Sequence, residues 1–159
     1  VYHACLVLLC SLASFAGGRT EDECSSDLGK PPFISVIYIT KRPGGYDVLF
    51  HSLAQQTFKD YELICIDDLN PERYPAVREY AARLNIPLTA LMPSKPKVRG
   101  KRFGQCNAIN SGLVVSRGKF ITVTQDNVWL PPHFLQRTAD FFRTHPRDAL
   151  LSYPERRVA

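Results

Sequence analysis

Three short runs of largely apolar, β-branched residues constrain the fold of this chain more than any other feature. They span residues 33–39, 62–66 and 119–124, and prolines and glycines bound the first of them. A run without polar alternation is expected for a strand that is buried on both faces, as in a parallel sheet covered by helices. The sequence therefore favours a sheet of buried strands.

Between these runs, apolar residues recur at the spacing of a helix. We expect helices over residues 47–56, 71–84, 103–116 and 133–143. We expect further short strands over residues 87–92 and 149–153. Strands that alternate with helices indicate an α/β fold, an open and mostly parallel sheet with helices on both faces.

A chain of 159 residues holds one core. We expect an apolar leader over 1–16, an acidic polar linker over 17–31 and a single domain over 32–159. The leader is shorter than the roughly 20 residues of a membrane span but suits a signal peptide or anchor. That interpretation predicts membrane association or the secretory pathway, and an incidental apolar leader predicts the cytoplasm.

The cysteines and the missing motifs exclude several classes of function. No Cys-x-x-Cys pair and no histidine at zinc spacing occur, so a zinc ribbon and a redox dithiol are not supported. We expect Cys65 and Cys106 to lie in the core, as free cysteines usually do. A nucleophile elbow, a P-loop and a Gly-x-Gly-x-x-Gly motif are absent from the sequence, which argues against a hydrolase triad or a kinase.

The formal charge of +5 is concentrated in one segment. Five basic side chains lie within eight positions: Lys95, Lys97, Arg99, Lys101 and Arg102. Such a segment favours a phosphate or polyanion partner, or is a solvated surface. Nucleic acid is disfavoured as the partner because no aromatic residues alternate with the basic ones.

Acidic residues follow two of the three apolar runs. Asp67 and Asp68 follow one run, and Gln125-Asp126-Asn127 follows another. Ligands of open α/β sheets bind beyond the carboxyl ends of the strands. One aspartate of the first pair can therefore accept hydrogen bonds from a ligand, or both can lie near a helix N-terminus. The second group can offer oxygen atoms to Mg²⁺ or Mn²⁺, or form a polar turn.

The order of several motifs resembles the family 2 glycosyltransferases with the GT-A fold, over about residues 32–152. The first block contains Ile34-Ser35-Val36-Ile37, Thr40 and Arg42-Pro43. The second contains Ser52-Leu53, Gln56-Thr57-Phe58, Tyr61-Glu62 and Asp67-Asp68. The third contains Asn110-Ser111-Gly112-Leu113, Gly118-Lys119-Phe120-Ile121 and Trp129-Leu130-Pro131-Pro132. Several motifs in the right order are far more specific than any single one.

This resemblance implies a site for a nucleotide-diphospho-sugar in the N-terminal, donor-binding part of a GT-A domain that is truncated at its C-terminal side. The substrate-binding residues that it implies are Thr40, Arg42, Asp68, Lys101, Arg102, Gln125 and Asp126. The metal-binding Asp-x-Asp of the family corresponds to Gln125-Asp126-Asn127, with amides where the two aspartates usually stand. Asp126 and Asn127 would then hold Mn²⁺ or Mg²⁺, and a shifted register would place Asp126 on the metal.

The implied reaction is an inverting transfer of a hexose to an unknown glycan, lipid or protein acceptor. Its general base is expected beyond Ala159, in the acceptor-binding half. Two alternatives stay open. One is a catalytically inactive domain, a pseudo-glycosyltransferase that binds nucleotide sugars without transferring them. The other is a receiver-like or flavodoxin-like domain, in which Asp67 and Asp68 form an acidic cluster.

Overall fold

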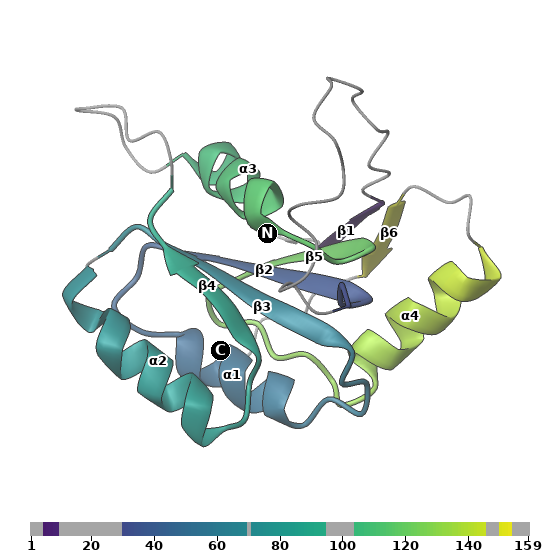
Figure 1. Ribbon diagram of the computed structural model, residues 1–159, viewed down its shortest axis with the longest axis horizontal. Coiled ribbons are helices and arrows are strands. Elements are labelled where there is room, and N and C mark those ends of the chain that lie inside the picture. The colour runs from purple at the N-terminus through teal and green to yellow at the C-terminus, as the bar shows by residue number, and fades with distance from the viewer. Residues whose placement is uncertain (1–4, 10–29, 70, 95–103, 146–149, 154–159) are drawn as a thin grey trace.

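The computed structural model describes residues 5–9, 30–69, 71–94, 104–145 and 150–153, which form one sheet flanked by helices (Figure 1). The strands are β1 (Cys5–Leu9), β2 (Ile34–Thr40), β3 (Tyr61–Asp67), β4 (Leu88–Met92), β5 (Phe120–Gln125) and β6 (Leu150–Tyr153). The helices are α1 (Tyr46–Ala54), the 3-10 turn η1 (Pro71–Arg73), α2 (Tyr74–Arg83), α3 (Gln105–Val115) and α4 (Phe134–Thr144). The expected alternation of strands and helices is confirmed from β2 onward.

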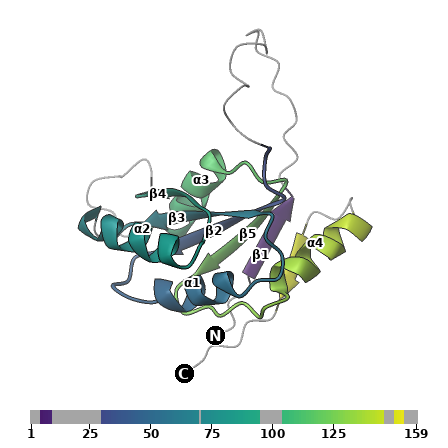
Figure 2. The same cartoon turned by 60° about the horizontal axis from the view of Figure 1, so that its bottom comes forward.

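Helices cover both faces of the sheet, as Figures 1 and 2 show. Side chains of β2 and β3 alternate between the faces and are buried on both. Tyr38 and Leu63 pack with α1, α2 and α4 on one face, whereas Ile37 and Ile64 pack with α3 on the other. A Cβ atom at Gly112 would lie 2.5 Å from the Ile37 side chain, so α3 approaches the sheet this closely because of a glycine.

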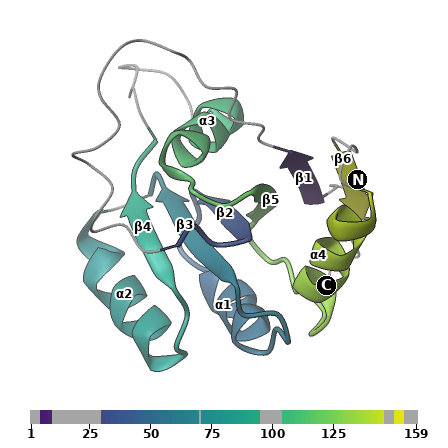
Figure 3. The same ribbon diagram turned by 45° about the vertical axis from the view of Figure 1, so that its right-hand side comes forward.

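The strand order is β4-β3-β2-β5-β1-β6, which runs from left to right in Figure 3. β4, β3, β2 and β5 are parallel, and β1 is antiparallel to both of its neighbours, β5 and β6. This arrangement confirms the open, mostly parallel sheet.

The strand β1 was not expected, because residues 5–9 belong to the apolar stretch that we interpreted as a leader. A short apolar run suits a sheet strand as well as a signal peptide. Residues 10–29 lie outside the described residues, so the leader and the linker stay predictions. Within the described ranges, no helix has the length and apolar character needed to cross a membrane.

The prediction for the two cysteines is half right. Cys65 on β3 is buried, as expected, whereas Cys106 on α3 is exposed. The buried residues of α3 are Ala108, Ser111 and Gly112. Cys106 precedes Ala108 by two positions, about half a helical turn, so it lies on the face that points away from the sheet.

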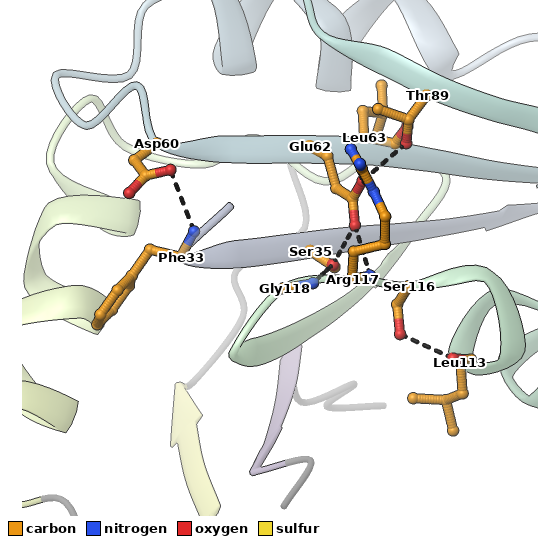
Figure 4. A network of polar contacts seen from close by, with 10 residues as sticks. All are labelled: Phe33, Ser35, Asp60, Glu62, Leu63, Thr89, Leu113, Ser116, Arg117 and Gly118. Carbon is orange, nitrogen blue, oxygen red and sulfur yellow. Dashed lines mark hydrogen bonds and ion pairs between the residues drawn. The ribbon is translucent and has the colours of Figure 1, made fainter. Parts of the chain in front are cut away.

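A buried carboxylate near the start of β3 fixes how the chain enters β5 (Figure 4). Glu62 accepts hydrogen bonds from the Ser35 hydroxyl at 2.6 Å, the Arg117 N–H at 2.8 Å and the Thr89 hydroxyl at 3.1 Å. The Gly118 N–H donates to the Ser35 Oγ at 2.8 Å. Burial by itself raises the pKa of Glu62, but these hydrogen bonds and the Arg117 charge outweigh it and hold the pKa below its ordinary value. The turn between α3 and β5 is therefore anchored to β2 and β3.

Candidate functional site

The structure brings three of the predicted site residues to one edge of the sheet. Thr40 pairs with Asp67 across β2 and β3, and Ile39 pairs with Gln125 across β2 and β5. The Asp68 N–H donates to the Thr40 carbonyl at 3.0 Å. Thr40, Asp68 and Gln125 thus lie at the carboxyl ends of three adjacent parallel strands, where open α/β sheets bind ligands.

Of the remaining predicted residues, three lie in the described part of the chain and two do not. Arg42 is exposed in the loop after β2, and its N–H donates to the Thr40 hydroxyl at 3.2 Å. Asp126 and Asn127 follow β5 directly, at the same edge as Gln125. Lys101 and Arg102 lie outside the described residues.

The two aspartates after β3 differ in their surroundings. Asp67 is 1% exposed, and its Oδ2 accepts from the Arg73 Nε at 2.5 Å. The same guanidinium donates to the Arg42 carbonyl at 2.7 Å. Asp67 therefore has a structural role: through Arg73 it links the end of β3 to the loop after β2.

Asp68 is only half-buried, and among the residues that the structure describes Ser94 holds its carboxylate. The Ser94 N–H donates to Oδ1 at 2.7 Å, and the Ser94 hydroxyl donates to Oδ2 at 2.6 Å. Ser94 itself is 4% exposed and follows β4. Of the two acids, Asp68 is the one that solvent and a ligand can reach.

The turn after β5 is held against the loop after β2. The buried Tyr38 hydroxyl donates to the Asp126 Oδ1 at 2.6 Å. Burial, followed by the charge of Asp126, raises the pKa of Tyr38, so this hydroxyl remains a donor at physiological pH. Asn127 has φ 60° and Gly45 has φ 95°, and a Cβ at Gly45 would lie 3.1 Å from the Asn127 Oδ1. The turn and the N-terminus of α1 therefore fit closely together.

Residues 125–127, which follow or end β5, are the candidates for holding a cation together with a ligand. In the described part of the chain, no three His, Cys, Asp or Glu side chains form a group that could hold a metal ion. Asp126 supplies one carboxylate, and Gln125 and Asn127 supply amide oxygens. Mg²⁺ usually binds through one or two carboxylates plus substrate phosphates, and Asp126 offers one such carboxylate directly after β5.

Sequence reasoning missed Tyr38, Arg73 and Ser94. Tyr38 offered a signal, because its hydroxyl lies within an apolar strand, two residues before Thr40 and on the same face. Arg73 and Ser94 offered none, since their partners come from the ends of other strands. Gly45 provides the tight turn before α1, since its φ of 95° is in the left-handed region.

Comparisons with known proteins agree with this architecture. The sequence profile "Glycosyl transferase family 2" matches residues 47–156. The crystal structure of S. aureus TarS 1-349 superposes with a TM-score of 0.57 and 22% identity, covering 71% of this chain and 33% of that one. The mannosyltransferase PcManGT from Pyrobaculum calidifontis, in complex with GDP-Man and Mn²⁺, superposes with a TM-score of 0.56 and 18% identity. The superposition covers 72% of this chain and 33% of that one.

TarS 1-349 in complex with UDP-GlcNAc is similar as well, with a TM-score of 0.55 and 21% identity, covering 71% of this chain and 32% of that one. This chain thus spans about a third of the length of these neighbours. The fold is a Rossmann-like α/β domain of the GT-A class, with polar residues gathered at its strand ends. The chain belongs to glycosyl transferase family 2, because the match extends over more than half of its residues.

Proposed function

We propose that this chain holds the donor site of a glycosyltransferase, which binds a nucleotide-diphospho-sugar while the sugar passes to an acceptor. One observation carries the proposal: the reachable acid Asp68 and the acid Asp126 lie at the ends of strands on either side of β2, at one edge of the sheet. Similar folds bind such donors, since the neighbouring structures contain UDP-GlcNAc or GDP-Man.

Each predicted residue has a role in this proposal. Asp68 accepts a hydrogen bond from the nucleoside, with Thr40 and Arg42 beside it. Gln125 and Asp126 lie toward the diphosphate. Lys101 and Arg102 border the base or the phosphates.

Asp126 and Asn127 would hold Mn²⁺ or Mg²⁺. Such a cation neutralises the charge that develops on a leaving diphosphate. The chain's own contribution is to orient Asp126: the hydroxyl of the buried Tyr38 donates to Oδ1 and fixes the position of the carboxylate. The close contact between Gly45 and Asn127 fixes the amide next to it.

The proposed transfer is inverting and moves a hexose to a hydroxyl of a glycan, lipid or protein. In such a transfer the acceptor oxygen attacks the anomeric carbon as the bond to the diphosphate breaks. A carboxylate general base then takes the proton of the acceptor hydroxyl. We assign that base to no residue of this chain.

Calorimetric titration of the full chain with UDP, GDP and TDP in the presence of Mn²⁺ tests the donor site. We expect at least one nucleotide to bind, and Asp126→Ala to weaken the binding about tenfold or more. Asp140→Ala is the matched control, because Asp140 is an exposed acid on α4 whose carboxylate pairs with Arg143. Absence of binding by all three nucleotides to folded protein would refute the proposal.

A pseudo-glycosyltransferase is the second candidate, favoured by the single carboxylate among residues 125–127. This candidate predicts that the chain binds a nucleotide sugar but neither transfers the sugar to an acceptor nor hydrolyses it from the nucleotide. Incubation with UDP-GlcNAc and Mn²⁺, followed by chromatography of free UDP, separates the two candidates. Hydrolysis or transfer above the rate of an Asp126→Ala sample would eliminate the inactive domain.

A further inference from the structure

The geometry around Asp68 points to the base of the donor, and this inference rests on the proposed function. Ser94 donates from two atoms to the two oxygens of one carboxylate, at 2.7 Å to Oδ1 and 2.6 Å to Oδ2. We infer that this arrangement selects a nucleotide with uracil or thymine over one with guanine.

The argument starts from the shape of a carboxylate. Its two oxygens accept paired hydrogen bonds along the edge that they share, and each oxygen keeps a second lone pair on its outer side. The N–H and the hydroxyl of Ser94 belong to one residue, so both reach Asp68 along the shared edge. A ligand must therefore use an outer lone pair.

Bases differ in how many donors they present to such an acceptor. Uracil and thymine have a single ring N–H, which one outer lone pair can accept. Guanine has a ring N–H beside an amino group, and this pair of parallel donors matches the shared edge of a carboxylate. With that edge occupied by Ser94, guanine keeps one donor unpaired when it binds at Asp68.

Because Ser94 is buried, its two hydrogen bonds to the Asp68 carboxylate are protected from solvent. Ser94 is 4% exposed, so bulk water competes little for its two donors. The Asp68 N–H is also tied to the Thr40 carbonyl at 3.0 Å, which anchors the aspartate to the end of β2. A guanine nucleotide would have to displace Ser94 from Asp68 or lose one hydrogen bond.

An unpaired donor in a desolvated site weakens binding by about fivefold to a hundredfold. Calorimetric titration of the full chain with UDP and GDP, each with Mn²⁺, measures the preference. We expect UDP to bind at least about fivefold more tightly than GDP, with TDP close to UDP. CDP is the matched ligand control, because cytosine replaces the ring N–H of uracil by an acceptor, and we expect it to bind more weakly than UDP.

Ser94→Ala tests whether the serine causes the preference. The variant loses the hydroxyl and keeps its backbone N–H, so guanine has to displace one hydrogen bond from Asp68 instead of two, and the UDP-to-GDP affinity ratio should fall about threefold or more. Ser94→Thr keeps a hydroxyl and should retain the ratio. Both affinities come from one preparation, so a partial loss of folded protein leaves the ratio unchanged.

Two results would overturn the inference while the proposed function survives: GDP that binds the wild-type chain as tightly as UDP, and a ratio that is the same in Ser94→Ala. Failure of all nucleotides to bind would instead overturn the proposed function, and the inference with it.

Discussion

Glu62→Gln removes a charge from the core without changing the size of the side chain, which is 3% exposed. A glutamine keeps one oxygen, which can still accept from Ser35 and the Arg117 N–H, but it turns an amino group toward Thr89. Hydrogen bonds to a charged group contribute about 1 kcal/mol more than neutral ones. Two weakened bonds and the lost Thr89 bond, together with the lost ion pair to the Arg117 guanidinium at 3.4 Å, therefore cost about 3 kcal/mol or more. In a domain of this size that lowers Tm by about 6–12 °C.

The pH dependence of stability tests the role of the Glu62 charge independently. The pKa of Glu62 is lower in the folded protein than in the unfolded chain, where it lies near 4.3. Its stabilisation is therefore complete above about pH 5 and is lost as the pH falls through the folded pKa. The difference in stability between wild type and Glu62→Gln should shrink as the pH falls below about 5.

Urea unfolding at pH 7 and thermal melts from pH 3 to 7 measure both effects. Asp140→Asn is the control, because Asp140 forms an exposed ion pair with Arg143, in which the two side chains are 56% and 51% exposed. Such pairs contribute about 0–1 kcal/mol. A Glu62→Gln variant within about 0.5 kcal/mol of wild type, or one that keeps the full pH dependence below pH 5, would refute the reasoning.

Three residues of the site, Tyr38, Gly45 and Arg73, give further predictions. Tyr38→Phe deletes the donor to Asp126, so we expect a loss of about 1.5–3 kcal/mol in urea unfolding and weaker Mn²⁺-dependent UDP binding by calorimetry. Gly45→Ala forces a side chain to φ 95° and should lose about 1–3 kcal/mol, whereas Gly44→Ala, with nothing within 4 Å of its Cβ, should change stability by less than about 0.5 kcal/mol. Arg73→Met leaves a buried carboxylate unpaired and should destabilise by about 3 kcal/mol or more; a Tm within about 2 °C of wild type would contradict this.

The sequence predicted the central strands because their residues are apolar on both faces. The runs over residues 33–39, 62–66 and 119–124 became β2, β3 and β5, which end at Thr40, Asp67 and Gln125, and parallel pairing places these ends together. The convergence of the predicted polar residues follows from topology alone. It needs no knowledge of side-chain contacts.

The sequence could not predict that Asp67 is buried in an ion pair while Asp68 remains accessible to a ligand. This difference depends on Arg73, which reaches back to the end of β3, and on Ser94, which arrives from the end of β4. No local sequence pattern identifies Arg73 or Ser94, because the packing of the strands determines which aspartate each one contacts. The exposure of Cys106 was mispredicted for a related reason: the sheet-facing side of α3 is set by small residues such as Gly112, which let the helix approach closely.

The central claim is that two strand ends contact one ligand, and amide NMR of the full chain titrated with UDP and Mg²⁺ tests it most directly. Mg²⁺ serves here because it is diamagnetic. We predict that the backbone amides of residues 67–68 and of residues 125–127 shift together, with one saturation midpoint, while those of α4 do not. Saturable shifts confined to one of the two strand ends, or spread over α4 instead, would contradict the account.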